Sequence, residues 1–156
     1  LVVYDISNHS CFDVINGTSS LLTLDSSLVS AQRILGFATE NHWRQMGIEI
    51  QEAVAIEEKE DEQSSEIINV IKGQRVLYPI GEVEFTTRAK VNVDILILSR
   101  RCSSSIKQLA ERFDLGLIIL DSSIPSYRLA ALVEGCVETS IPYHNVAEEG
   151  AFVREF

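Results

Sequence analysis

Three histidines and two aspartates are the residues of this chain from which metal-dependent chemistry could be built. The histidines are His9, His42 and His144, and no two lie two, three or four residues apart. The HxH and HExxH spacings, which place two imidazoles on one ion, are therefore absent from the sequence. A metal site would need His9 and His144 to converge in space with Asp25 and Asp121. We expect no metal and no cofactor, and these four residues remain the candidates for a reshaped catalytic site.

The cysteines are the second group that could be reactive. Cys11, Cys102 and Cys136 are far apart and form no CxxC motif. We interpret them as buried or half-buried thiols, although one disulfide remains open. As an alternative, Cys102 follows two arginines at a predicted helix start, where a lowered pKa would favour a thiolate with His9 or His144 as its base. No GxSxG elbow for a nucleophilic serine is present.

A basic and hydroxyl-rich segment, RRCSSS, begins at Arg100. Arg100, Arg101, Ser103 and Ser104 are the anion-binding candidates, because free N–H groups at a helix start favour an anion. The alternative is that Ser103 or Ser104 is the helix cap and that the arginines pair with the acidic loop, residues 57–65. No glycine-rich phosphate loop or ladder of aromatic residues accompanies the segment, so we expect no nucleotide cofactor and no stacking on single-stranded bases.

Composition limits the classes of function that remain. The chain has 156 residues, 46% of them hydrophobic, which is enough for one domain with a core. Its formal charge of −10 excludes an autonomous DNA-binding domain, because phosphates are repelled. Residues 57–65 are expected to form an exposed acidic loop, or alternatively a site for a cation or basic partner. No apolar run reaches the roughly 18–20 residues that span a bilayer, and we expect no signal peptide.

The elements that must position these residues change character along the chain. In the first half, Asn16-Gly17 and Lys72-Gly73-Gln74 are typical of hairpin turns. The second half alternates strand and helix, which indicates parallel pairing with right-handed crossovers. We therefore expect an α/β fold with one mixed sheet, or two sheets face to face, and helices outside. The predicted strands cover residues 1–6, 10–15, 20–24, 52–57, 67–71, 75–80, 91–98, 115–120, 143–146 and 150–156; the predicted helices cover 28–46 (one or two, interrupted near Gly36), 103–113 and 125–139.

Two segments repeat a short pattern. SSLLTLDSS (residues 19–27) and LGLIILDSS (residues 115–123) are both apolar strands that end in Asp-Ser-Ser. One interpretation is two unrelated strand ends, each of which caps the next element of the chain. The other is two related halves whose strand ends gather at one edge, where α/β folds place sites.

The chain resembles the C-terminal soluble domain of ComEC-type competence proteins, which are membrane channels for DNA uptake. The resemblance lies in residues 1–27 and 93–153, whereas residues 40–90 match only in length and general character. Its motifs are Tyr4-Asp5, His9-Ser10, Asp25-Ser26, Asp121-Ser122-Ser123, Ile141-Pro142-Tyr143-His144 and Glu149-Gly150-Ala151-Phe152.

The wider family is similar to metallo-β-lactamase-like hydrolases, so the resemblance implies a reduced αββα sandwich of mixed sheets with outer helices. Hydrolysis would need an HxHxDH metal-binding loop, which this sequence lacks. Where the catalytic versions carry SHHGS after a strand, this chain has SRRCS from Ser99, and arginine cannot bind zinc. The later glycine-histidine motif is also missing after Asp121-Ser122-Ser123. The resemblance therefore implies the fold and the uptake context, and it argues against the hydrolysis.

We expect residues 1–156 to be a single domain from a longer inner-membrane protein, facing the periplasm. Its expected role is accessory or structural and non-catalytic. The expected partner is the channel portion of the same chain, with DNA contacted only weakly through Arg100, Arg101 and Lys107. The alternative is a metal-dependent nuclease or phosphodiesterase with a site reshaped from His9, Asp25, Asp121 and His144.

Overall fold

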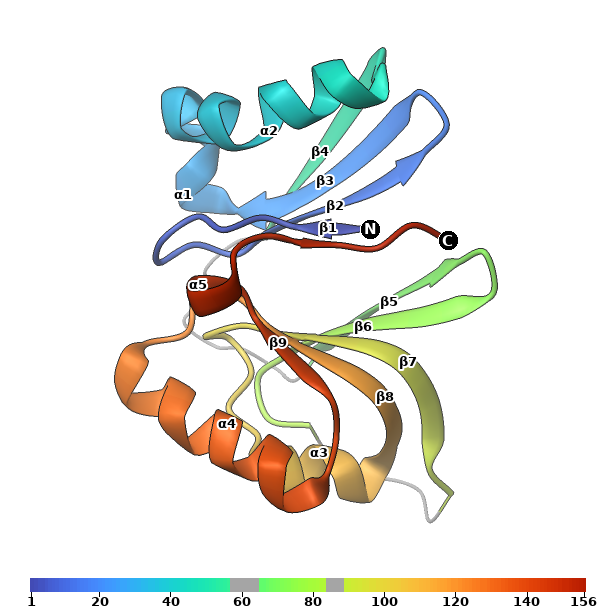
Figure 1. Cartoon of the computed structure of the whole chain (residues 1–156), viewed down its shortest axis with the longest axis vertical. Coiled ribbons are helices and arrows are strands. Elements are labelled where there is room, and N and C mark those ends of the chain that lie inside the picture. Colours follow the sequence, from blue (N-terminus) through green and yellow to red (C-terminus); the bar gives the residue numbers. More distant parts are fainter. Residues whose placement is uncertain (57–64, 84–88) are drawn as a thin grey trace.

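The computed structural model describes residues 1–56, 65–83 and 89–156, which form two five-stranded sheets and five helices within these ranges (Figure 1). The first sheet contains β1 (Val2–Val3), β2 (Cys11–Asn16), β3 (Ser19–Asp25), β4 (Ile50–Ile56) and β10 (Phe152–Val153). The second contains β5 (Ser65–Ile71), β6 (Gln74–Ile80), β7 (Val91–Leu98), β8 (Phe113–Leu120) and β9 (Tyr143–Asn145). The helices are α1 (Ser26–Val29), α2 (Gln32–Met46), α3 (Ile106–Arg112), α4 (Ser126–Thr139) and α5 (Val146–Glu149).

Both sheets are mixed. The first has the order β10-β1-β2-β3-β4, antiparallel except for the parallel pair β3 and β4. The second has the order β5-β6-β7-β8-β9, with an antiparallel β5–β6 hairpin and parallel pairing from β6 onward. Gly17 and Gly73 turn the two hairpins with φ of 61° and 86°, a left-handed conformation that costs glycine little. This confirms both predicted hairpins and the parallel second half.

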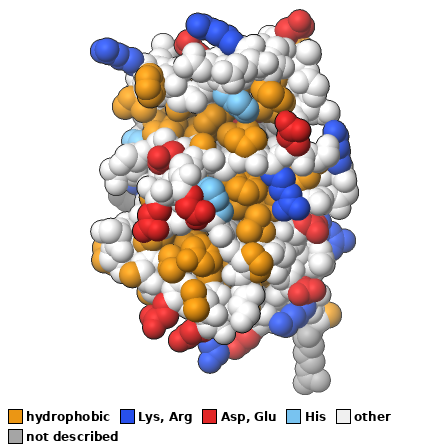
Figure 2. Space-filling model, in the orientation of Figure 1, with side chains coloured by type: hydrophobic (Ala, Val, Ile, Leu, Met, Phe, Trp, Pro, Cys, Tyr) orange, Lys and Arg blue, Asp and Glu red, His pale blue; other side chains and the backbone are white. Residues whose placement is uncertain are grey.

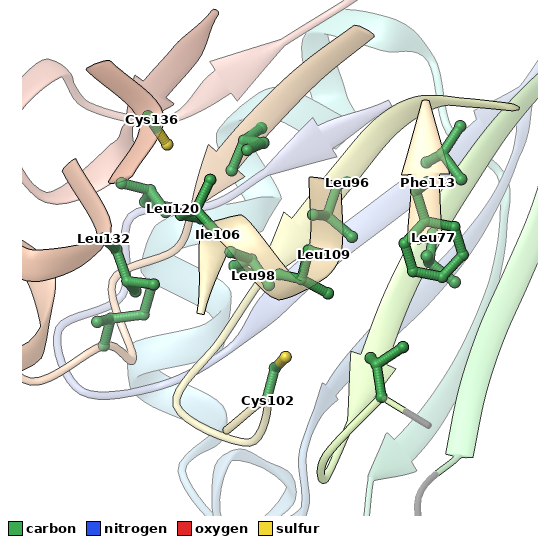
Figure 3. Close-up of a cluster of buried hydrophobic side chains, with 14 residues drawn as sticks. Leu77, Leu96, Leu98, Cys102, Ile106, Leu109, Phe113, Leu120, Leu132 and Cys136 are labelled. Carbon is green, nitrogen blue, oxygen red and sulfur yellow. The ribbon is translucent and has the colours of Figure 1, made fainter. Parts of the chain in front are cut away.

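Three hydrophobic cores define four layers. The central core lies between the sheets and contains Phe12 from β2, Tyr78 from β6 and Ile97 from β7. A second core packs α1 and α2 on the outer face of the first sheet. A third packs α3 and α4 on the outer face of the second sheet, and Figure 3 shows Cys102 and Cys136 among its aliphatic side chains. The α/β class with mixed sheets and outer helices is therefore confirmed, in the face-to-face arrangement.

Several predicted boundaries are wrong for local reasons. The first strand is only Val2–Val3, since Ile6 bridges back to His9 in a tight loop. The break in the first helical region falls at residues 30–31 between α1 and α2, and Gly36 lies inside α2. Val146 begins helix α5, which the sequence did not predict. The closing strand keeps only two residues.

The helix after β7 begins later than predicted. Neither Ser103 nor Ser104 caps it. Ser105 is the N-cap: its hydroxyl accepts from the Gln108 N–H, and the Gln108 side chain accepts from the Ser105 N–H. This reciprocal capping box satisfies two backbone donors at once, which explains its selection over the neighbouring serines. Of the predicted acidic loop 57–65, residues 57–64 lie outside the described residues, and Ser65 already belongs to β5.

Candidate functional site at the strand ends

The carboxyl ends of four strands from both sheets meet at one edge of the molecule. In the first sheet Asp25 ends β3 beside Ile56, the last residue of β4. In the second sheet Leu98 ends β7 beside Leu120, the last residue of β8. The loops that come after β7 and β8 contact each other, because the Arg100 N–H donates to the Ser123 hydroxyl at 2.9 Å.

The two Asp-Ser-Ser segments therefore lie at the same edge, as the second interpretation of the repeat predicts. We call Ser10, Asp25, Tyr78, Arg100, Arg101, Asp121 and Ser123 the strand-end cluster.

A buried ion pair between Arg101 and Asp25 is the centre of the strand-end cluster. Arg101 Nε and Nη2 both donate to Asp25 Oδ1, at 3.1 and 2.8 Å. Their side chains are 3% and 1% exposed. Arg101 Nη2 also donates to the Ile56 carbonyl at 3.3 Å, and the Ser10 N–H donates to Asp25 Oδ2 at 2.9 Å. Both charges are thus removed from water and compensated within the fold, which a buried charge requires.

Arg100 and His9 surround the second oxygen of Asp25. Arg100 Nη2 lies 3.5 Å from Asp25 Oδ2, and Arg100 Nη1 donates to the Asn8 carbonyl at 3.4 Å. His9 Nδ1 lies 4.0 Å from Asp25 Oδ2 and 3.2 Å from the Ser27 hydroxyl. Serine and aspartate thus face the same ring nitrogen. A serine–histidine–aspartate relay needs them on opposite nitrogens, so this trio does not have that geometry.

Asp121 is a second fully buried carboxyl of the strand-end cluster. Its Oδ1 accepts from the Ser123 N–H at 3.0 Å and from the Ser123 hydroxyl at 2.5 Å. Burial raises the pKa of Asp121 from 3.8 to about 7, against the opposing effect of hydrogen bonds from Ser10 and Ser123. Desolvation disfavours the carboxylate more than these hydroxyls stabilise it. Asp121 therefore takes up a proton far more readily than an exposed aspartate.

Tyr78 joins the two sheets within the strand-end cluster. Its hydroxyl donates to the Ser10 hydroxyl at 3.1 Å, from β6 of one sheet to the loop that precedes β2 of the other. Burial, the largest cause, raises the pKa of Tyr78 above its ordinary value, so the phenol stays protonated and acts as a donor. Sequence reasoning missed Tyr78, because a tyrosine inside an apolar strand carries no motif.

The four candidates for a reshaped metal site do not come together. His9 lies near Asp25, but His144 Nε2 contacts the Gly150 carbonyl at 2.9 Å and His144 Nδ1 lies 3.6 Å from Glu149. Across the described ranges, no group of three or more His, Cys, Asp or Glu side chains is arranged to hold a metal ion.

The four anion-binding candidates are also separated by their roles in the fold. Arg101 is buried against Asp25, and the Ser104 hydroxyl is buried and accepts from the Val83 N–H at 2.9 Å. Ser103 is exposed, and its N–H donates to the Gly81 carbonyl at 3.1 Å. Arg100, with its side chain 32% exposed, is therefore the one charged candidate that reaches solvent.

The cysteines are buried free thiols, as the first interpretation predicts, and none of the three forms a disulfide within the described chain. The alternative, a Cys102 thiol with a lowered pKa, is wrong. Burial raises its pKa, and this effect exceeds the opposing influence of Ser104 and Arg128. Burial likewise raises the pKa of Cys11 to about 12 and of Cys136 to about 11. A thiol with a raised pKa is a poor nucleophile at neutral pH.

The four layers define a mixed α/β domain. At the edge where the strand ends meet, the charged side chains of the strand-end cluster pair with one another. A family model for the ComEC C-terminal domain matches residues 1–156, so the chain belongs to that family. Membership links it to competence, the uptake of DNA through a membrane protein. No curated protein and no solved structure matches the chain. Within the described residues, none of the helices has the length and apolar character needed to cross a bilayer.

Proposed function

We propose that this domain is a non-catalytic, accessory part of a DNA-uptake channel. We further propose that it is built on a metallo-β-lactamase-like scaffold whose metal site has been replaced by an ion pair. The observation that carries the proposal is the buried contact of Arg101 with Asp25, 2.8 Å between Nη2 and Oδ1. The guanidinium is a permanent cation. It supplies inside the fold the positive charge that a bound metal would otherwise give to this carboxylate.

The layered architecture supports the scaffold. Two mixed sheets pack face to face, α1 and α2 cover one outer face, and α3 and α4 cover the other. In the hydrolases that the sequence resembles, the loop after a strand carries the metal-binding histidines. Here the loop after β7 carries Arg100 and Arg101, and Arg101 forms a buried ion pair with Asp25. An added divalent ion at Asp25 would face two guanidinium groups, which repel it.

The exposed cations limit the role that DNA contact can have. Arg101 is buried and cannot reach a phosphate, which leaves Arg100 and the exposed Lys107 from the predicted set. Two phosphate contacts provide little affinity, and the net charge of −10 opposes it. We propose that the domain packs on the channel portion of its own chain, on the periplasmic side of the inner membrane, and contacts DNA only locally.

Metal content and nuclease activity test the proposal together. The chain is incubated with zinc or manganese, desalted and analysed for bound metal, and it is assayed on single- and double-stranded DNA. We expect substoichiometric metal, no cleavage, and no retardation of DNA on a gel at physiological salt. Stoichiometric metal with cleavage that Asp25→Asn abolishes would establish the reshaped nuclease instead. Submicromolar DNA binding would contradict the accessory role.

A further inference from the structure

The solvent face of α2 has exposed apolar side chains near its centre and an arginine toward each end, with Glu40 between Phe37 and Arg44. Phe37 is 87% exposed and Ile34 is 51% exposed on this helix. Arg33 lies four residues before Phe37 and Arg44 lies seven after it, so the helical repeat places all three on one face. We call Arg33, Ile34, Phe37 and Arg44 the α2 face.

The opposite side of α2 holds the helix in place without using the α2 face. Trp43 Nε1 donates to the buried Asp13 carboxylate at 2.7 Å. Leu35, Ala38 and Trp43 pack against the outer core of the first sheet. An almost fully exposed phenylalanine therefore contributes little to the folding of this domain.

The segment between Asp25 and Glu49, which contains α2, differs in charge from the rest of the chain. Between Asp25 and Glu49 the chain has two arginines and one glutamate, a formal charge of +1, whereas the whole chain carries −10. The glutamate, Glu40, is partly compensated by Arg44, 3.2 Å away. Figure 2 shows both basic and acidic side chains at the α2 end of the molecule. The net charge of −10 opposes binding to any anionic surface, so two arginines alone would give little affinity. Here they flank exposed apolar side chains, which can add the free energy of burial that a lipid surface offers.

We propose that the α2 face docks on an anionic lipid surface. Phe37 and Ile34 would enter the boundary between headgroups and acyl chains, while Arg33 and Arg44 would pair with headgroup phosphates. The shape agrees, because α2 forms the outermost layer at one end of the long axis and can lie along a plane (Figure 1). The proposal is independent of whether the strand-end cluster is catalytic.

The opposite outer helix provides an internal control. On α4, Tyr127 is 83% exposed, yet the same helix face carries Glu134 and Glu138 at helical spacings. The formal charge of α4 is −1, from Arg128, Glu134 and Glu138, whereas that of α2 is +1, so an anionic surface favours α2. If exposure alone drove binding, α4 would bind as well as α2. If charge complementarity matters, only α2 binds.

Co-sedimentation with vesicles tests the proposal. The chain is mixed with vesicles of phosphatidylcholine alone or of phosphatidylcholine with phosphatidylglycerol, at low and high salt. We expect partitioning only onto the anionic vesicles, weakened by salt. Phe37→Ala should lower the partitioning onto anionic vesicles about tenfold or more, because the side chain that would be buried in the lipid boundary is lost. Arg33→Ala and Arg44→Ala should each lower it about fivefold, and Tyr127→Ala should leave it unchanged.

Three results would overturn the proposal. One is an equal or absent response to the two kinds of vesicle. Another is unaltered partitioning of Phe37→Ala. The third is a dimer in sedimentation equilibrium that Phe37→Ala dissociates, which would assign the α2 face to a second copy of the chain. Circular dichroism and urea midpoints equal to those of the parent chain would show that each variant is folded.

Discussion

Arg101 donates two hydrogen bonds to one oxygen of Asp25, although 76 residues separate them in the chain and they lie at the ends of strands of different sheets. The guanidinium thus links the ends of β3 and β7 at the place where both sheets terminate. The pair balances two charges that neither sheet could bury alone. Loss of the pair should therefore destabilise the whole domain.

Arg101→Met should lower the free energy of unfolding by about 3–5 kcal/mol, because it leaves the buried Asp25 carboxylate without its main cation. Arg100→Met should cost about 1 kcal/mol or less, since Arg100 is partly solvated. Urea unfolding monitored by the single tryptophan, Trp43, measures both. The double variant Asp25→Asn/Arg101→Met should recover part of the loss. An Arg100 variant as damaging as the Arg101 variant would contradict this assignment of charge.

Asp121 should make stability depend on pH in the direction opposite to an ordinary salt-bridged aspartate. Folding raises its pKa from 3.8 to about 7, so between these values the folded state holds a proton that the unfolded state releases. Its contribution is therefore fully present below about pH 4 and is lost as the pH rises through about 7. Between pH 4 and pH 8, the free energy of unfolding of Asp121→Asn should rise relative to that of the parent chain by about 2–4 kcal/mol. Urea midpoints at the two pH values measure this gain, and parallel curves would contradict it.

The three thiols should react slowly with iodoacetamide in the native chain. Cys11, Cys102 and Cys136 are buried, and each has a raised pKa. Mass spectrometry should find fewer than one modified thiol per native chain and three per chain unfolded in urea. Rapid modification of Cys102 alone would restore the activated-thiol alternative.

Two glycines in helices should respond to alanine with opposite signs. At Gly135 in α4, a Cβ would lie 2.9 Å from Ile106 Cβ, so Gly135→Ala should cost about 1–3 kcal/mol through overpacking between α4 and α3. At Gly36 in α2, the nearest atom is Glu40 Oε1 at 2.8 Å, the end of a flexible side chain. Gly36→Ala should therefore raise the free energy of unfolding by about 0.5–1 kcal/mol, because alanine has the higher helix propensity. Thermal unfolding of the two variants measures both signs, and a stabilised Gly135→Ala would contradict the tight α3–α4 contact.

The sequence predicted the features that depend on local pattern. The turn at Gly73 and the strand Val91–Leu98 agree with the structure because turn chemistry and continuous apolar runs act over a few residues. Of the two interpretations of the repeated Asp-Ser-Ser, the structure agrees with the placement of Asp25 and Asp121 at one edge. The length of β1 and the existence of α5 were not predicted, since contacts across the fold decide where short elements end, including the pairing of Val2 with Val153.

The sequence could not reveal how the site residues are paired. Arg101 was selected as an anion-binding residue, and its anion is Asp25 from the other sheet. Tyr78 carried no signal, because its hydroxyl finds Ser10 only after the sheets pack. Cys102 has two arginines before it in sequence, yet burial in the helix-facing core decides its pKa. In each case contacts made across the fold, rather than neighbours in the sequence, decide the role of the residue.

The hydrogen bond from Tyr78 to Ser10 crosses the plane along which the two sheets would separate. Separating the sheets would leave the hydroxyls of Tyr78 and Ser10, and the charges of Arg101 and Asp25, without partners between apolar faces. Neither half of the sandwich can therefore melt first without penalty. Heating should produce one cooperative transition, with no stable half-folded species for proteases to attack.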